Sequence, residues 1–229
     1  MSAAGTTIEI EDLSLDRGRR PVLRDISARF SEGVVTAIVG PSGAGKTSLL
    51  RCINRLEEPL EGRVLLDGTD IRELDPTELR KRVGMIFQTP VLFEGGVRAN
   101  LSYGLEAVDD SVLERALEVA GLGASFLERG STALSVGQAQ RVCIARALVR
   151  DPEALILDEP TSALDMKATK RIEELLGALA QSGLTIIVVT HDLDQARRIA
   201  SKGVLLDEGR VVTTGTLEEV AAEWPGGVA

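Results

Sequence analysis

Eight residues, 40–47, restrict most strongly what this chain can fold into. They read Gly-Pro-Ser-Gly-Ala-Gly-Lys-Thr, which fits the pattern G-x-x-x-x-G-K-[ST] of a loop that surrounds phosphate groups. The β-branched apolar run 34–39 precedes this loop, and residues 47–54 follow it with apolar residues at helical spacing. We therefore predict a strand, a phosphate-binding loop and a helix in immediate succession.

The residue types in this loop have physical reasons. Three glycines allow backbone N–H groups to turn inward around a phosphate, where a Cβ atom would obstruct the approach. The next helix adds the positive end of its dipole. Lys46 supplies a charge for the β- and γ-phosphates, and the Thr47 hydroxyl is a ligand for Mg²⁺. The predicted phosphate contacts are Gly40, Pro41, Ser42, Gly43, Ala44, Gly45, Lys46, Thr47 and Ser48.

Composition narrows the remaining classes of protein. The chain has 229 residues and an apolar content of 44%, enough for one sizeable α/β domain or a domain with an insertion. Its net charge of −9 argues against a nucleic-acid partner, because phosphate backbones recruit basic surfaces. No apolar run is long enough to span a membrane, and no signal-peptide pattern is present, so we expect a cytosolic chain. We expect Cys52 and Cys143 to be buried and reduced.

Strand and helix patterns alternate along most of the chain, but residues 89–152 read as helical only. Strands are expected at 6–11, 22–30, 34–39, 63–67, 83–87, 154–157 and 184–190, with a turn at 17–21 and a hairpin across 207–210. Helices are expected after the phosphate loop and at 77–82, 112–120, 138–150, 166–181 and 192–200. This alternation predicts a largely parallel sheet with helices on both faces.

Two acids follow the apolar residues 155–157. An aspartate at a strand end, here Asp158, can hold Mg²⁺ beside a phosphate loop. Glu159 is then placed to orient and polarise an attacking water. The alternative, two solubilising acids at a strand end, is weak beside a phosphate loop.

These motifs occur in an order that resembles the ATP-binding cassette (ABC) ATPases, and the resemblance runs from Ile8 to Gly215. The ordered motifs are the phosphate loop, Gln88, residues 134–138 (Leu-Ser-Val-Gly-Gln), Asp158-Glu159, residues 162–165 (Ser-Ala-Leu-Asp) and His191. The resemblance implies a P-loop NTPase fold with a small antiparallel β-subdomain and an inserted helical subdomain. The implied limits are 6–88 with 153–216 for the nucleotide-binding core, 89–152 for the helical subdomain and 217–229 for a short tail.

The resemblance also implies site roles. Glu159, His191 and Gln88 would be catalytic, and Thr47, Gln88 and Asp158 would serve the metal, so the implied cofactors are ATP and Mg²⁺. Ser135, Gly137 and Gln138 would face the γ-phosphate of ATP held by a second copy, and Asp165 would couple the two sites. Val136 departs from the glycine of the family pattern L-S-G-G-Q. Arg17 occupies the position of the family's adenine-stacking aromatic, where its guanidinium plane could stack on the base.

The implied function is that of an energy-coupling ATPase subunit. Two cassettes would close on ATP and drive a membrane-spanning permease made by a separate chain, at the cytoplasmic face of the membrane. Residues 91–93 would contact that permease, or else would only pack onto the core. A non-transport ABC ATPase is the second hypothesis, disfavoured by the acidic charge and by the lack of long heptad insertions or a second cassette. Residues 50–59 resemble phosphate and polar amino-acid importers, whereas the spacing from Gln88 to Ser135 also suits metal exporters.

Overall fold

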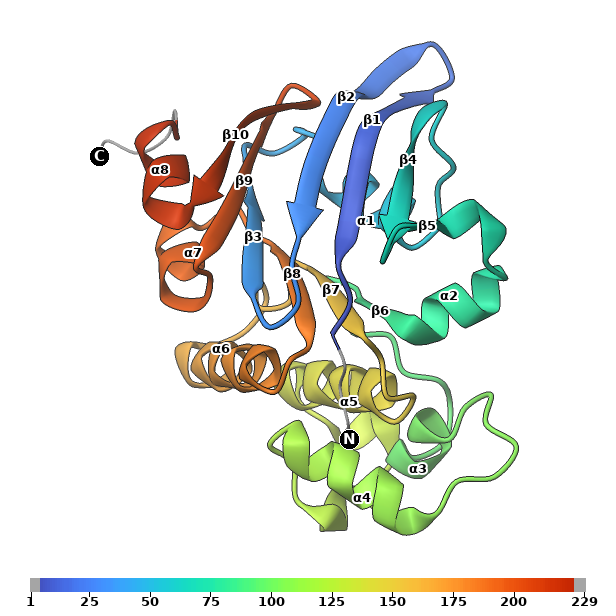
Figure 1. Ribbon diagram of the computed structural model, residues 1–229. Helices are drawn as coiled ribbons and strands as arrows, with labels where there is room; N and C mark the ends of the chain where they lie inside the picture. The colour runs from blue at the N-terminus through green and yellow to red at the C-terminus, as the bar shows by residue number, and fades with distance from the viewer. Residues whose placement is uncertain (1–4, 225–229) are drawn as a thin grey trace.

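The protein is described by a computed structural model that covers residues 5–224 (Figure 1). Its central sheet has six strands in the order β10-β9-β3-β8-β7-β6. The five strands from β9 to β6 are parallel, and β10 joins the edge antiparallel to β9. The strands are β3 (Val35–Val39), β6 (Val83–Ile86), β7 (Ala154–Asp158), β8 (Thr185–Val189), β9 (Lys202–Asp207) and β10 (Arg210–Thr216). The largely parallel sheet predicted from the sequence is therefore confirmed.

A second, antiparallel sheet lies beside the first, at the top of Figure 1. Its order is β2-β1-β4-β5, formed by β1 (Ile8–Arg17), β2 (Arg20–Phe30), β4 (Glu61–Leu66) and β5 (Thr69–Asp70). The chain thus builds the antiparallel sheet mainly from residues that flank the phosphate loop and its helix.

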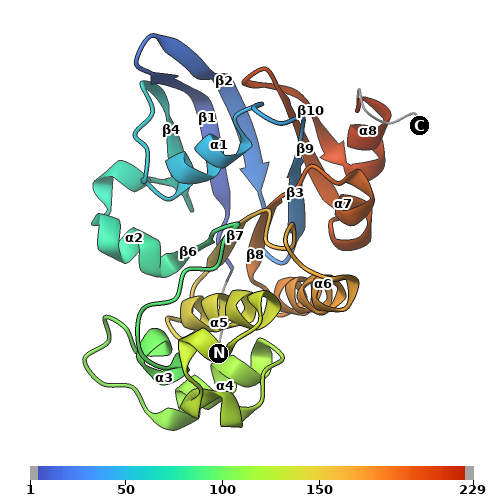
Figure 2. The same ribbon diagram turned by 180° about the vertical axis from the view of Figure 1, so that it is seen from behind.

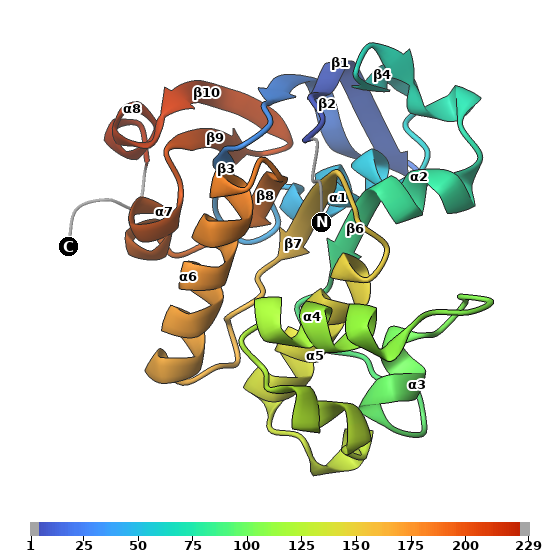
Figure 3. The same cartoon turned by 60° about the horizontal axis from the view of Figure 1, so that its bottom comes forward.

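Helices cover the central sheet. They are α1 (Lys46–Ile53), α2 (Pro76–Arg82), α3 (Val97–Leu101), α4 (Asp110–Val119), α5 (Val136–Leu148), α6 (Met166–Gln181), α7 (Leu193–Ile199) and α8 (Leu217–Ala222). Helices α3, α4 and α5 gather at the end opposite the antiparallel sheet (Figures 1 and 3). Residues 225–229 of the expected C-terminal tail lie outside the described residues, and no helix in the described range is long and apolar enough to cross a membrane.

Two hydrophobic cores lie on opposite faces of the central sheet. On β3, Ala37 belongs to the core under α3–α8, whereas the next residue, Ile38, belongs to the core shared with the antiparallel sheet. Ile186 and Ile187 on β8 divide in the same way, as period-two side-chain alternation requires. Strands buried on both faces explain the continuous apolar runs in the sequence.

Helix α1 lies between the two sheets (Figure 2). Its residues Leu49, Leu50 and Ile53 are buried in the core shared by the antiparallel sheet and the central sheet. Cys52 on the same helix is buried and free, as is Cys143 on α5, which confirms that prediction. The helix that follows the phosphate loop is therefore held from both sides, and the loop has a rigid support.

Some element bounds differ from those predicted. Strand β1 continues to Arg17, beyond the predicted end at 11. The prediction ended too early because Asp12 takes a positive φ of 50° and the pairing register shifts between Ile10 and Leu13. This bulge interrupts the alternation that defines a strand in sequence. The predicted turn at 17–21 shrinks to the two residues between Arg17 and Arg20. Helix α6 has the predicted bounds, and the predicted hairpin is formed by β9 and β10.

Candidate functional site

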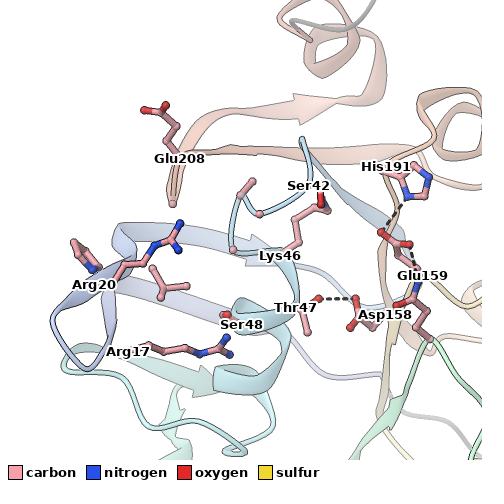
Figure 4. A pocket seen from close by; sticks show the side chains of 17 residues that line it. Arg17, Arg20, Ser42, Lys46, Thr47, Ser48, Asp158, Glu159, His191 and Glu208 are labelled. Atoms are coloured by element: carbon pink, nitrogen blue, oxygen red, sulfur yellow. Dashed lines mark hydrogen bonds and ion pairs between the residues drawn. The ribbon is translucent and has the colours of Figure 1, made fainter.

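A cavity of about 950 Å³ opens over the start of α1 (Figure 4). It is bounded by the phosphate loop, by the ends of β7 and β8, and by the hairpins between β1 and β2 and between β9 and β10. Its lining residues are Arg17, Arg20, Pro21, Val22, Ser42, Gly43, Ala44, Gly45, Lys46, Thr47, Ser48, Gln88, Asp158, Glu159, His191, Glu208 and Gly209. This volume matches the size of sites that take nucleotide-sized ligands.

The three glycines of the loop differ in how much space surrounds them. Gly43 (φ +83°) has nothing within 4 Å of an added Cβ, so its open side faces the cavity. A Cβ on Gly40 would lie 2.0 Å from the carbonyl oxygen of Leu206, and one on Gly45 would lie 2.7 Å from Cδ2 of Leu23. Close packing of the chain is therefore a second reason for glycine at positions 40 and 45, and the role of all three glycines around a phosphate stays a prediction.

Lys46 begins α1 and is buried. Its Nζ donates hydrogen bonds to the carbonyl oxygens of Gly40 (2.7 Å) and Pro41 (2.8 Å). Burial lowers the pKa of Lys46 below its usual value, and the nearby carboxylates of Glu159 and Asp158 oppose that shift. The ammonium group is thus held at the loop by neutral acceptors, where an anionic phosphate would be a stronger one.

Thr47 and Asp158 meet beneath the loop. The Thr47 hydroxyl donates to Oδ1 of Asp158 at 3.0 Å, although the two residues are 111 positions apart in the sequence. Burial raises the pKa of Asp158, while the hydrogen bond from Thr47 acts in the opposite direction. A hydroxyl and a carboxylate at the end of a phosphate loop are oxygen ligands of the kind that Mg²⁺ takes together with phosphate. The residues present therefore fit a magnesium nucleotide.

Glu159 has an unusual backbone conformation for a residue with a side chain, with φ at +44°. Its N–H donates to the carbonyl oxygen of Val189 on β8 at 3.0 Å. Its carboxylate is contacted on both oxygens: Gln88 Nε2 lies 3.1 Å from Oε2, and His191 Nδ1 lies 3.0 Å from Oε1. Strain of this kind is concentrated at functional sites in proteins. The structure thus brings together Gln88, Glu159 and His191, which lie far apart in the sequence.

Six predicted site residues do not line the cavity: Gly40 and Pro41 of the phosphate loop, and Ser135, Gly137, Gln138 and Asp165. Ser135 caps α5, where its hydroxyl accepts from the N–H of Gln138 (3.3 Å) while Oε1 of Gln138 accepts from the N–H of Ser135 (3.0 Å). Gly137 lies in the first turn of that helix, close to Ala168 of α6. Asp165 caps α6 through the N–H of Ala168 at 2.8 Å. Val136 is the first helical residue of α5 and does not have a positive φ.

The opposite end of the cavity holds the predicted Arg17 together with Arg20 and Glu208, which the sequence analysis missed. In Figure 4, Arg17, Arg20 and Glu208 lie at the end away from Glu159 and His191. The Arg17 guanidinium forms an ion pair with Glu57, and not with Asp158 or Glu159 at the phosphate end of the cavity. Arg20 and Glu208 come from two hairpins, and the cluster of arginines around Gly18 was the available sequence signal. Their approach to one cavity depends on tertiary packing.

A phosphate loop between a parallel strand and α1, with an acidic strand end beside it, defines a P-loop nucleotide hydrolase. The family model described as "ABC transporter" matches residues 23–162, and a model described as an AAA domain matches residues 131–194. The chain belongs to the ABC transporter family, as an ATP-binding and ATP-hydrolysing subunit.

Relatives and solved structures agree with this assignment. The chain is 42% identical over 219 residues to ABC transporter I family member 17 of Arabidopsis thaliana, covering 93% of this chain and 83% of that protein. It is 42% identical over 230 residues to the phosphate import ATP-binding protein PstB of Thermotoga maritima, covering 93% and 91%. The structure of cbiO1 from Clostridium perfringens, part of the ABC transporter complex cbiONQ, matches with a TM-score of 0.86 at 33% identity, covering 94% of this chain and 90% of that chain.

Proposed function

We propose that this subunit hydrolyses magnesium-bound ATP to drive import of phosphate, or of a closely similar oxyanion, through a membrane-spanning subunit made by a separate chain. The observation that supports hydrolysis is the convergence of Lys46, the Thr47–Asp158 pair and the doubly contacted Glu159 on one cavity. The cargo class rests on three relatives named as phosphate import proteins, which are 42%, 41% and 40% identical to this chain.

The proposed chemistry divides the cavity by residue. The phosphate loop and Lys46 would bind the β- and γ-phosphates, and Thr47, Asp158 and Gln88 would hold the magnesium ion. The ion supplies charge neutralisation on the phosphate oxygens when bound. Glu159 accepts a proton from the attacking water. Gln88 and His191 hold the Glu159 carboxylate in position. The Arg17 end receives the base, and the guanidinium offers a flat cationic surface for stacking.

The residues that lie outside the cavity support a two-copy mechanism. Ser135, Gly137 and Gln138 begin α5, and Asp165 begins α6; all four are absent from the cavity lining. In the proposed homodimer, a second copy presents this helix start to the nucleotide of the first, so that the positive end of α5 faces the γ-phosphate. ATP then favours the closed pair, and loss of the γ-phosphate releases it.

A separate surface is proposed for the membrane-spanning partner. Val91, Phe93 and Tyr103 are 59%, 41% and 57% exposed, and the Phe93 and Tyr103 rings stack with centroids 4.2 Å apart. Leu92 packs against the core instead, so packing explains Leu92 but not its two neighbours. Exposed apolar side chains of this size mark an interaction surface. Binding there would place the subunit on the cytoplasmic face of the membrane.

The proposed function is tested by isolating the partner. A tagged Glu159→Gln variant, purified from its native membranes with ATP and Mg²⁺, should carry a membrane-spanning chain with it. The wild-type pair reconstituted in vesicles should then accumulate labelled phosphate only when ATP is present on the side of this subunit. Accumulation of another solute but not phosphate would overturn the cargo class. Purification without any membrane chain would overturn the transport role.

A further inference from the structure

A buried polar bridge joins the two loops that follow β7 and β8. At its centre is Gln195 of α7, which is 5% exposed. Its Oε1 accepts from the hydroxyl of Thr190 at 2.8 Å, and its Nε2 donates to the hydroxyl oxygen of Thr161 at 2.5 Å. Both threonines are buried as well. The side chain of Gln195 therefore links two segments that are otherwise far apart in the sequence.

The two ends of the bridge adjoin the residues that contact each other in the cavity. Thr161 comes two positions after Glu159, and Thr190 comes directly before His191. The strand pairing between β7 and β8 ends at Asp158 and Val189, followed by one last backbone hydrogen bond from Glu159 to Val189. Beyond that point, side chains set the spacing of the two loops. His191 itself is largely exposed, so core packing does not fix its ring.

Gln195 is itself held firmly. Its N–H donates to Oδ1 of Asp192 at 3.0 Å, and the N–H of Asp192 donates to the Thr190 hydroxyl at 3.0 Å. A longer contact of 3.4 Å runs from Nε2 to Glu173 of α6. The Gln195 amide thus uses its acceptor and its donors together, and a buried amide that is satisfied in this way rigidifies the groups around it.

We infer that Gln195 is a positioning residue for ATP hydrolysis: through Thr161 and Thr190 it fixes the distance between Glu159 and His191. The inference rests on the roles proposed above for those two residues. Loosening the bridge leaves the phosphate loop intact but lets His191 move relative to Glu159. Misplacement by about 1 Å can cost on the order of a hundredfold in rate, so the effect falls on kcat and not on ATP binding.

The test compares variants that remove the bridge with variants that keep it. Gln195→Leu removes both hydrogen bonds at nearly constant size, and Thr190→Val removes one of them. Thr190→Ser keeps the hydroxyl and should restore the rate. Gln181→Leu makes the same change at the exposed end of α6 and is the matched control. The measurements are steady-state kcat and KM, ATP affinity and the melting temperature of the full chain, with its membrane partner where the rate requires it.

We expect Gln195→Leu and Thr190→Val to lower kcat roughly tenfold or more, with ATP affinity within about twofold and Thr190→Ser close to wild type. In a His191→Ala background, Gln195→Leu should cause little further loss, because the group that it positions is gone. An equal loss in both backgrounds would mean a structural role and would overturn the inference, as would an unchanged kcat for a folded Gln195→Leu or Thr190→Val variant. If His191→Ala and Glu159→Gln themselves keep full activity, the proposed function fails instead.

Discussion

Nδ1 of His191 lies 3.0 Å from Oε1 of Glu159 although 32 positions separate the two residues. They meet because β7 and β8 are adjacent parallel strands whose carboxyl ends reach the same edge of the sheet. Gln88 contacts the other carboxylate oxygen of Glu159 and follows the next strand, β6, which pairs with β7. Three neighbouring strand ends therefore hold one carboxylate in the cavity that the phosphate loop lines.

Replacement of that carboxylate should separate binding from turnover. Glu159→Gln keeps the size of the side chain and removes its ability to accept a proton, so turnover should fall by roughly a hundredfold or more. ATP affinity should persist, because Lys46 and the loop are unchanged, and the ATP-bound dimer should accumulate. Phosphate release and size-exclusion chromatography measure the two effects. Glu174→Gln, an exposed change on α6, is the control, and a fully active Glu159→Gln would remove Glu159 from the role of base.

Removal of the Lys46 ammonium group from the phosphate loop should abolish ATP binding. Lys46→Ala deletes the ammonium group that Gly40 and Pro41 hold at the loop, so ATP binding should be lost when measured by titration calorimetry. Lys170→Ala removes an exposed lysine of α6 and should bind ATP like the wild type. Wild-type affinity in a folded Lys46→Ala variant would contradict the assignment of the phosphate loop.

The loop glycines should differ when each receives a methyl group. Gly43→Ala places a Cβ in open space. The free energy of unfolding should therefore fall only by the cost of a left-handed backbone conformation, about 1–2 kcal/mol, while ATP binding should be weaker. Gly68 has a similar φ and equally open surroundings away from the cavity. Gly68→Ala should therefore have the same melting temperature as Gly43→Ala, with unchanged ATP affinity. Gly40→Ala brings a Cβ within 2.0 Å of a carbonyl oxygen and should melt at the lowest temperature. Equal ATP affinity in the Gly43 and Gly68 variants would contradict this view of the loop.

Much of the nucleotide-binding unit could be predicted because its signals are local. The loop pattern, its flanking strand and helix, and α6 are each determined within a short stretch of sequence. The bulge at Asp12 was not predictable, because it breaks the alternation that reveals a strand. Arg20 and Glu208 were missed since only the packing of two hairpins brings them to the cavity. Gln195 was missed because a polar residue in a short helix usually faces solvent.

The buried position of Asp158 leads to a prediction about pH and stability. Burial raises the pKa of this carboxyl in the folded protein, so the folded state keeps the proton over a pH range in which the unfolded chain has lost it. The stability contributed by Asp158 is thus fully present below its ordinary value of 3.8 and is lost as pH rises through the folded pKa. Ionised Asp158 should therefore destabilise the nucleotide-free protein at neutral pH.

Asp158→Asn removes the destabilising effect of the buried charge and keeps an oxygen that accepts from the Thr47 hydroxyl. Without nucleotide, the variant should melt a few degrees above the wild type at pH 7, and the difference should shrink as the pH falls. Asp109→Asn, at an exposed position, should show no such gain. With ATP and Mg²⁺ the order should reverse, because the wild type gains binding energy that the variant lacks. An Asp158→Asn protein that melts below the wild type at pH 7 without nucleotide would show that the Thr47–Asp158 pair stabilises the fold instead of being held ready for the ion.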